Sequence, residues 1–208
     1  MTGAFLAGLV AGYGVAIPVG AIAILILGLS ARTSFRVGSA AALGVATADG
    51  MYAAVAALGG AAVASGLAPF AGPLRLIAAG VLLALACLTA WRAMRPPAPA
   101  QEPSPRGGLD TPVRAFAAVL ALTLLNPATV VYFVALVLGR GDVLGSSPVG
   151  AAAFTAGVFL ASASWQLLIA GGGSLIGRAL TGPRGRRVTA LLSSAIIAAL
   201  AVATVLGV

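Results

Sequence analysis

Histidine and lysine are absent from this chain of 208 residues, and cysteine occurs once, as Cys87. Without histidine there is no Ser–His or Cys–His nucleophilic pair and no HExxH zinc site. A single cysteine forms no intramolecular disulfide. A soft-metal site is disfavoured as well, because thiolate and imidazole ligands are nearly missing. We therefore expect no enzyme activity, no cofactor and no metal site.

Charged residues are also scarce. They make up 8% of the chain, and hydrophobic residues make up 61%, whereas a soluble domain carries about 25% charged residues. This composition cannot cover a surface that faces water, so it predicts an integral membrane protein in contact with the lipid bilayer. The net charge of +8 does not indicate nucleic acid as a partner, because the arginines lie between apolar runs, where they set topology.

Six apolar runs are long enough for the roughly 20 helical residues that a bilayer core requires. They are Ala4–Leu29, Val37–Ala64, Leu74–Trp91, Val113–Leu138, Pro148–Ala170 and Val188–Val208. The fifth run is the least regular, because the three glycines at 171–173 are expected to end it or bend it. We expect an all-α integral membrane protein with six transmembrane helices.

A Pro-rich polar segment divides the chain. Residues 95–112 read RPPAPAQEPSPRGGLDTP, which is the composition of a flexible linker. We therefore divide the chain into a first three-helix repeat, residues 1–94, a cytoplasmic linker, residues 95–112, and a second three-helix repeat, residues 113–208.

Arginine is concentrated on one side of the predicted membrane. Ten of the twelve arginines lie after the first, third and fifth runs, and the other side holds only Arg75 and Arg140. Because positive loops stay in the cytoplasm, both termini are expected outside it. We interpret the exclusive use of arginine as the mark of a high-GC bacterial genome. The predicted location is therefore the bacterial cytoplasmic (inner) membrane, spanned several times.

Three helices per half is an odd number, so the two halves must cross the membrane in opposite senses. This is the arrangement of inverted repeats, which in secondary transporters place sites near the midplane between the repeats. Pro18 and Pro127 lie equally deep in the first and fourth runs, 109 residues apart, in agreement with such a repeat. The alternative is chance similarity between helices rich in alanine and glycine.

The two prolines are expected to break their helices. Proline has no N–H, so it leaves the carbonyl four residues back without a partner, here those of Gly14 and Thr123. In lipid such groups need a partner in the protein or a hydrated cavity, and matched breaks point to a transport site. Kinks that only shape packing are the alternative. Asn126 is expected to bond either to a solute or between helices.

Asp49 is the one acid inside an apolar run. A charge at the bilayer centre costs roughly 2.5–3.5 kcal/mol on insertion scales, so such residues usually serve transport. We expect Asp49 to bind a proton or a cationic solute, because no basic residue lies at the centre of any run. The structural alternative is that Asp49 accepts hydrogen bonds from Tyr13, Tyr52 or Thr47.

Two further patterns concern packing and polarity. A stripe of small residues predicts the close approach of another helix, within the chain or in a homodimer. It consists of Ala4, Gly8, Gly12, Ala16 and Gly20. A polar patch in the fifth run either lies near the mouth of a path or anchors the helix at the interface. It consists of Ser162, Ser164, Trp165 and Gln166.

Three segments together resemble the LysE/RhtB-type exporter family, which consists of small six-helix proteins that export amino acids and related solutes with the proton motive force. They are GYGVAIPVGAIAIL, GSAAALGVATADGMYAAVAALG and LTLLNPATVVYFVAL. The resemblance extends over the whole chain and implies functional roles for Pro18, Gly20, Asp49, Asn126 and Pro127. Ala21 and Ala128 replace a Pro and a Lys of the family pattern, which leaves the solute open.

We therefore predict a secondary transporter that exports amino acids or related small solutes, by proton antiport with alternating access. Asp49 would bind the proton or cation. The predicted substrate path consists of Pro18, Gly20, Thr47, Tyr52, Asn126 and Pro127. The alternatives are an exporter of a small amine or of a metal cation held by oxygen ligands, and a non-transporting membrane scaffold subunit.

Overall fold

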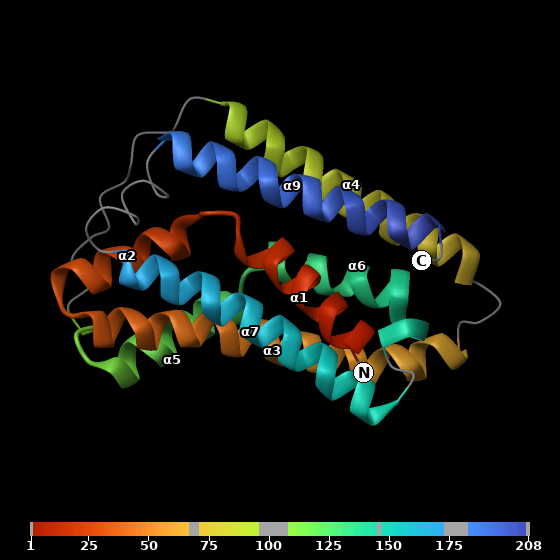
Figure 1. Ribbon diagram of the computed structural model, residues 1–208, viewed down its shortest axis with the longest axis horizontal. Coiled ribbons are helices and arrows are strands. Elements are labelled where there is room, and N and C mark those ends of the chain that lie inside the picture. Colours follow the sequence, from red (N-terminus) through yellow and green to blue (C-terminus); the bar gives the residue numbers. More distant parts are fainter. Residues whose placement is uncertain (1, 67–70, 96–107, 145–146, 173–182, 207–208) are drawn as a thin grey trace.

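The computed structural model describes residues 2–66, 71–95, 108–144, 147–172 and 183–206 (Figure 1). Within these ranges all regular secondary structure is helical. The helices are α1 (Thr2–Ala16), α2 (Ala21–Arg32), α3 (Phe35–Gly66), α4 (Ala71–Met94), α5 (Pro112–Leu124), α6 (Pro127–Leu144), α7 (Pro148–Gly171) and α9 (Pro183–Leu206). The expected linker falls mostly on 96–107, outside the described residues. The division into residues 1–94, 95–112 and 113–208 therefore stays a prediction.

Proline and serine mark where helices of the second half begin. Pro112 opens α5 and Pro148 opens α7, since a first-turn proline loses no helical hydrogen bond. The side chain of Ser147 caps α7 by accepting a hydrogen bond from the Gly150 N–H at 3.0 Å. These local signals place the fourth and fifth runs within a residue of the predicted starts, and α7 ends at Gly171, where the glycines begin.

Two of the expected helices are broken at their prolines. α1 and α2 meet at 82° across Ile17–Gly20, and α5 meets α6 at 60° across Leu125 and Asn126. In Figure 1 the first break is the non-helical red connection between α1 and α2. The predicted breaks are confirmed, and both are sharper than ordinary kinks because a few residues at each break leave the helix altogether.

By length and composition, three described helices suit a membrane crossing, namely α3, α7 and α9, and each bent pair adds one to make up to five. The third expected run falls within α4, where the described apolar stretch is Leu76–Arg92. All the described spans are therefore helical, as predicted, and the sixth crossing stays a prediction.

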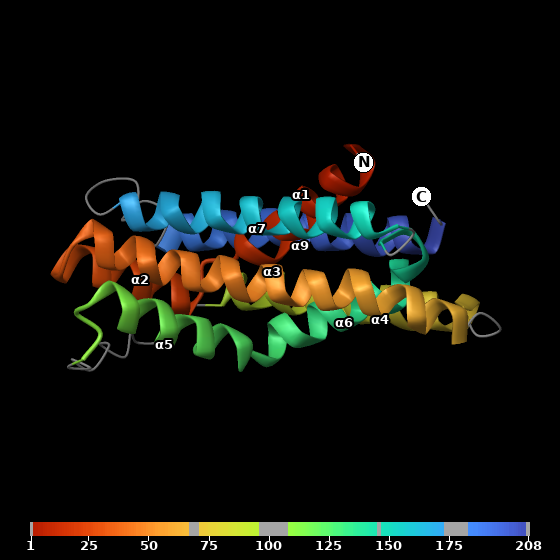
Figure 2. The same ribbon diagram turned by 90° about the horizontal axis from the view of Figure 1, so that it is seen from below.

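The helices form layers in which segments from the two halves lie against each other. α4 and α9 pack side by side along one edge, while α3 packs against α5, α6 and α7 (Figures 1 and 2). α1 lies on α7 and also reaches α9. Figure 1 places both termini at one end of the molecule, and the α2–α3 junction with the starts of α5 and α9 at the other.

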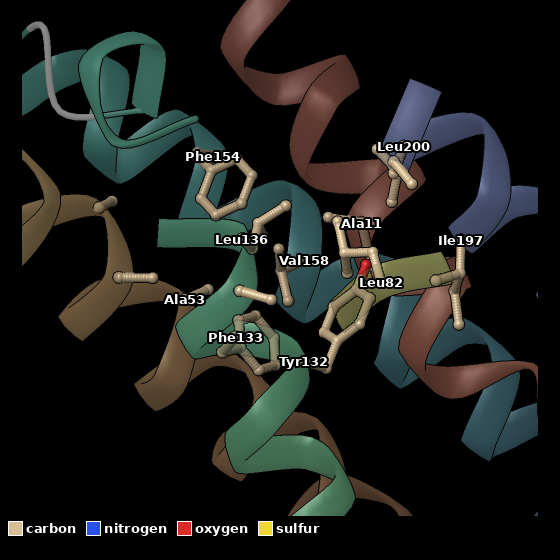
Figure 3. Packing of buried hydrophobic residues seen from close by; sticks show 14 of the residues in the cluster. Ala11, Ala53, Leu82, Tyr132, Phe133, Leu136, Phe154, Val158, Ile197 and Leu200 are labelled. Atoms are coloured by element: carbon tan, nitrogen blue, oxygen red, sulfur yellow. The ribbon is translucent and has the colours of Figure 1, made fainter. Parts of the chain in front are cut away.

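The main apolar core lies where α6 enters between helices of both halves (Figure 3). Its larger members are Leu82, Tyr132, Phe133, Leu136, Phe154, Val158, Ile197 and Leu200. Alanines such as Ala53 and Ala57 on α3 are fully buried beside them. Because lipid is as apolar as these side chains, close packing rather than burial from water holds such helices together.

Glycine allows α1 to approach α7 at backbone distance. A Cβ at Gly12 would lie 2.7 Å from the Val158 carbonyl oxygen, and a Cβ at Gly8 would meet the Phe154 carbonyl oxygen. Gly157 faces α1 in the same way from α7. The close approach that the small-residue stripe predicts is confirmed at Gly8 and Gly12, where the neighbour is α7 of the same chain, whereas Gly20 lies beyond α1 and has no atom within 4 Å of an added Cβ. A homodimer stays a prediction.

Candidate transport site

Asp49 and Ser162 form a hydrogen-bonded pair between α3 and α7. The Ser162 hydroxyl donates to Asp49 Oδ2 at 2.7 Å. Asp49 is 2% exposed and Ser162 is fully buried. The small residues around them allow this depth, because Ala46 and Ala48 on α3 are also fully buried. A carboxylate is therefore held inside the helix packing by one neutral donor, which comes from the other half of the chain.

The donors that the structural alternative named are used elsewhere. The Tyr13 hydroxyl pairs with the Ser164 hydroxyl at 2.9 Å, and the Thr47 hydroxyl donates to the Leu43 carbonyl of its own helix at 2.8 Å. Tyr52 reaches the second helix break instead. The structural alternative, in which one of these three bonds to Asp49, is wrong, because α7 packs closely enough on α3 to supply Ser162.

At the first break, the carbonyl that Pro18 leaves without a helical partner is taken up by α9. Ser193 is fully buried, and its hydroxyl donates to the Gly14 carbonyl at 2.7 Å. The Tyr132 hydroxyl of α6 donates to the Ala11 carbonyl, one turn earlier, at 2.9 Å, and Figure 3 shows it pointing toward Ala11. The predicted orphan carbonyl therefore exists, and a side chain of the protein satisfies it here.

At the second break, a tight turn and one tyrosine share the freed groups. The Asn126 N–H donates to the Thr123 carbonyl at 3.1 Å, so the orphan predicted there is satisfied locally. The Tyr52 hydroxyl of α3 donates to the Leu124 carbonyl at 2.6 Å. The Asn126 side-chain oxygen accepts from the Ala128 N–H at 3.1 Å. Asn126 thus caps α6, a local role that neither sequence alternative included.

The structure brings together some of the predicted path residues and leaves others apart. Tyr52 meets the second break directly, and its ring stacks on Phe133 with centroids 5.7 Å apart. Gly20 and Pro127 are exposed at the two breaks, and Pro18 is half-buried. Thr47 makes its hydrogen bond within α3 only.

The polar patch of α7 contains buried polar atoms that have no hydrogen-bond partner among the described residues. Gln166 is buried one turn after Ser162. Among the described residues, neither its Oε1 nor the indole nitrogen of Trp165 has a hydrogen-bond partner. The same described part of the chain holds no group of three or more His, Cys, Asp or Glu side chains placed to bind a metal ion.

Asp49 and both prolines stand out in the sequence, but the side chains that bond to Asp49 and to the freed Gly14 carbonyl do not. Ser162 belongs to the polar patch of the fifth run, and no sequence pattern distinguishes Ser193. The carbonyl that Pro18 frees was the available signal, since it requires a donor from somewhere in the protein. A sequence does not show which of many membrane serines meets that carbonyl.

Apolar helices and two sharply broken helix pairs indicate a multi-pass helical membrane protein, and a carboxylate buried between two of its helices is the candidate transport site. The chain belongs to the LysE type translocator family, which matches it over residues 14–207, so the resemblance drawn from the sequence is confirmed. Members of this family are transporters rather than enzymes, and the family points to export of small solutes. No curated protein and no solved structure matches the chain.

Proposed function

We propose that this translocator exports amino acids or related small solutes across the cytoplasmic membrane, by proton antiport with alternating access. The observation that carries the proposal is Asp49, a carboxylate that is 2% exposed and bonded from α3 to α7 through Ser162. A buried ionisable group inside a membrane helix is costly, so it is kept where it binds a proton or a solute.

A six-helix inverted repeat would place this pair at the interface of two three-helix units. In such a repeat, α1 and α3 of the first unit correspond to α5 and α7 of the second. The contact of α1 with α7 then has the contact of α5 with α3 as its counterpart, and both contacts occur. The contacts of α3 with α7 and of α4 with α9 are their own counterparts, and both occur as well. The two broken pairs also correspond to each other. These relations support the proposed repeat and its alternating access.

Proton binding at Asp49 would change the contact between α3 and α7. The ionised carboxylate accepts only, whereas the protonated one also carries a donor. The hydrogen bond from Ser162 would be stronger to the ionised carboxylate than to the protonated one, because a hydrogen bond to a charged acceptor is stronger than one to a neutral acceptor. Loading a proton therefore weakens the contact that joins the two units, which would couple protonation to their movement.

The carboxylate of an amino-acid solute would bind at a helix N-terminus. α2 begins after Gly20, which supplies no side-chain cap, so the first N–H groups of α2 are open to an anion. The corresponding end of α6 is capped by Asn126. The solute path would therefore pass α2 at Gly20, together with the other predicted path residues Pro18, Thr47, Tyr52, Asn126 and Pro127.

The proposed orientation places both termini outside the cytoplasm of a bacterial cell. The α2–α3 junction, with Arg32 and Arg36, lies at the end of the molecule opposite the two termini (Figure 1). The starts of α5 and α9 lie at that same end and carry Arg114 and Arg184. Gathering of arginine at one end is what the positive-inside rule requires of a cytoplasmic face.

Transport by purified protein in liposomes under an imposed pH gradient tests the proposal. A pooled panel of amino acids, amines and metal cations is offered to the wild type, to Asp49→Asn and to Asp110→Asn. Asp110 is an exposed acid just before α5 and serves as the matched control. We expect gradient-dependent movement of an amino-acid-like solute, lost in Asp49→Asn and kept in Asp110→Asn. Folded wild type that moves no solute, or equal rates in all three proteins, would refute the proposal.

A further inference from the structure

The break in the first helix is held by side chains from the opposite half of the chain. The Gly14 carbonyl accepts from Ser193 of α9 at 2.7 Å, and the Ala11 carbonyl accepts from Tyr132 of α6 at 2.9 Å. Ser193 is fully buried and Tyr132 is 2% exposed. Two neutral hydroxyls therefore tie the last turns of α1 to α6 and α9, immediately before Pro18.

We propose that Ser193 and Tyr132 are positioning residues that hold α1, and with it the Pro18 break, in the arrangement seen here. The inference rests on the proposed transport function, for which it specifies a step: solute movement requires these two hydrogen bonds to be released. The bonds from Ser193 to the Gly14 carbonyl and from Tyr132 to the Ala11 carbonyl are the α1 hydrogen bonds.

Ser193 differs from its neighbour in the partner that it reaches. Ser194 is also buried, but its hydroxyl donates to the Ala190 carbonyl of its own helix at 2.8 Å. Serine in membrane helices commonly bonds back to the carbonyl four residues earlier. Ser193 instead bonds to α1, 179 residues away in the chain, because Pro18 leaves the Gly14 carbonyl without its helical donor.

Gly14 allows the close approach on which both hydrogen bonds depend. A Cβ at this position would lie 3.0 Å from the Tyr132 hydroxyl oxygen and 3.3 Å from Ile196 Cγ2. A side chain here would thus press on α6 and α9 together. At Gly14 the backbone of α1 faces the two helices that supply the hydroxyls, so glycine, proline and the two donors form one arrangement.

The second break is held from the opposite direction. Tyr52 belongs to the first half, and its hydroxyl donates to the Leu124 carbonyl at the end of α5. Each broken helix thus receives a hydroxyl from the half to which it does not belong. The two breaks differ in number of donors, because the described residues give two such bonds to α1 and one to the α5–α6 break. Among the described residues, the first break is therefore held by more bonds from the opposite half than the second.

A distance measurement between α1 and α9 tests the proposal independently of any solute. Spin labels are attached to Leu6→Cys on α1 and Val202→Cys on α9, in a Cys87→Ala background that removes the single native cysteine. Both label sites are about half exposed, at 53% and 52%, so the labels do not disturb the core. Pulsed EPR on protein in liposomes then gives the populations of each α1–α9 distance.

We expect one dominant distance in the parent protein, and a minor distance that grows about threefold in Ser193→Ala and in Tyr132→Phe. A threefold change corresponds to about 0.6 kcal/mol, a typical value for one hydrogen bond between membrane helices. Ser194→Ala is the matched control, since it removes a hydroxyl that bonds only to its own helix. This control should give the parent distribution.

Identical distance distributions in Ser193→Ala, Tyr132→Phe and the Ser194→Ala control would overturn the proposal. Tyr132→Phe keeps the buried ring, so it provides the test even if Ser193→Ala does not fold. Transport by the parent protein is measured in the same liposomes. Absence of solute movement by the parent refutes the proposed function, whereas the distance populations decide separately whether the two hydroxyls hold α1.

Discussion

Ser162 on α7 lies 2.7 Å from Asp49 on α3, and this hydrogen bond joins residues 113 positions apart in the chain. Both side chains are buried, so the pair is sheltered from water and from lipid headgroups. A carboxylate in such a place depends on the donors that the protein provides, because no solvent can replace them.

Ser162→Ala is expected to destabilise the protein and to slow transport. Removal of the donor leaves a buried acceptor unsatisfied, which costs about 1–3 kcal/mol. Ser164→Ala is the control, because Ser164 is exposed and bonds only to Tyr13 and to its own helix. Thermal inactivation in detergent and uptake into liposomes are compared for the two variants. Equal losses in both would show that Asp49 does not depend on Ser162.

Gly12→Ala is expected to lower the unfolding temperature by forcing α1 away from α7. The added Cβ would lie 2.7 Å from the Val158 carbonyl oxygen, which is backbone and cannot rotate away. Overpacking of this kind typically costs about 1–3 kcal/mol. Gly3→Ala has no atom within 4 Å of the new Cβ and should behave as the wild type. Scanning fluorimetry in detergent measures both, and an unchanged Gly12→Ala would contradict the close packing of α1 on α7.

Substitutions of Asn126 separate capping from solute binding. Asn126→Ala removes the acceptor for the Ala128 N–H and should cost about 0.5–2 kcal/mol, as for other lost N-caps. Asn126→Ser keeps a capping oxygen but has no amide donor, so stability should recover. Thermal unfolding and transport are measured for each. Restored stability with restored transport assigns Asn126 to capping alone, whereas restored stability without transport assigns its amide to the solute.

Tyr52→Phe is expected to weaken the second break while leaving its stacking on Phe133 in place. The Leu124 carbonyl loses the donor that lies 2.6 Å away, at a cost of about 0.6 kcal/mol for a typical bond between membrane helices. Tyr13→Phe is the comparison, since its hydroxyl pairs with that of Ser164 on the exposed side. We expect slower solute turnover in Tyr52→Phe than in Tyr13→Phe. Equal turnover in the two variants would argue against a role for the α5–α6 break.

The breaks were predictable because their causes are local. Pro18 and Pro127 remove helical hydrogen bonds wherever the chain folds, and the helices do separate there at 82° and 60°. The cap at Asn126 is local too, because an Asn directly before a first-turn proline is a common start of a helix. Hydrophobic length alone located α3, α7 and α9 as candidate crossings, and the third run falls within α4.

Composition, run length and proline position are written in the chain, and they were enough to indicate a helical membrane protein with two matched helix breaks and one buried acid. The hydrogen-bond partners of the buried acid and of the carbonyl freed at the first break depended on how the helices pack. Ser162 meets Asp49 and Ser193 meets Gly14 across 113 and 179 residues of chain. Glycines and alanines let many pairs of helices approach, so the choice among similar serines depends on which helices meet and at what rotation.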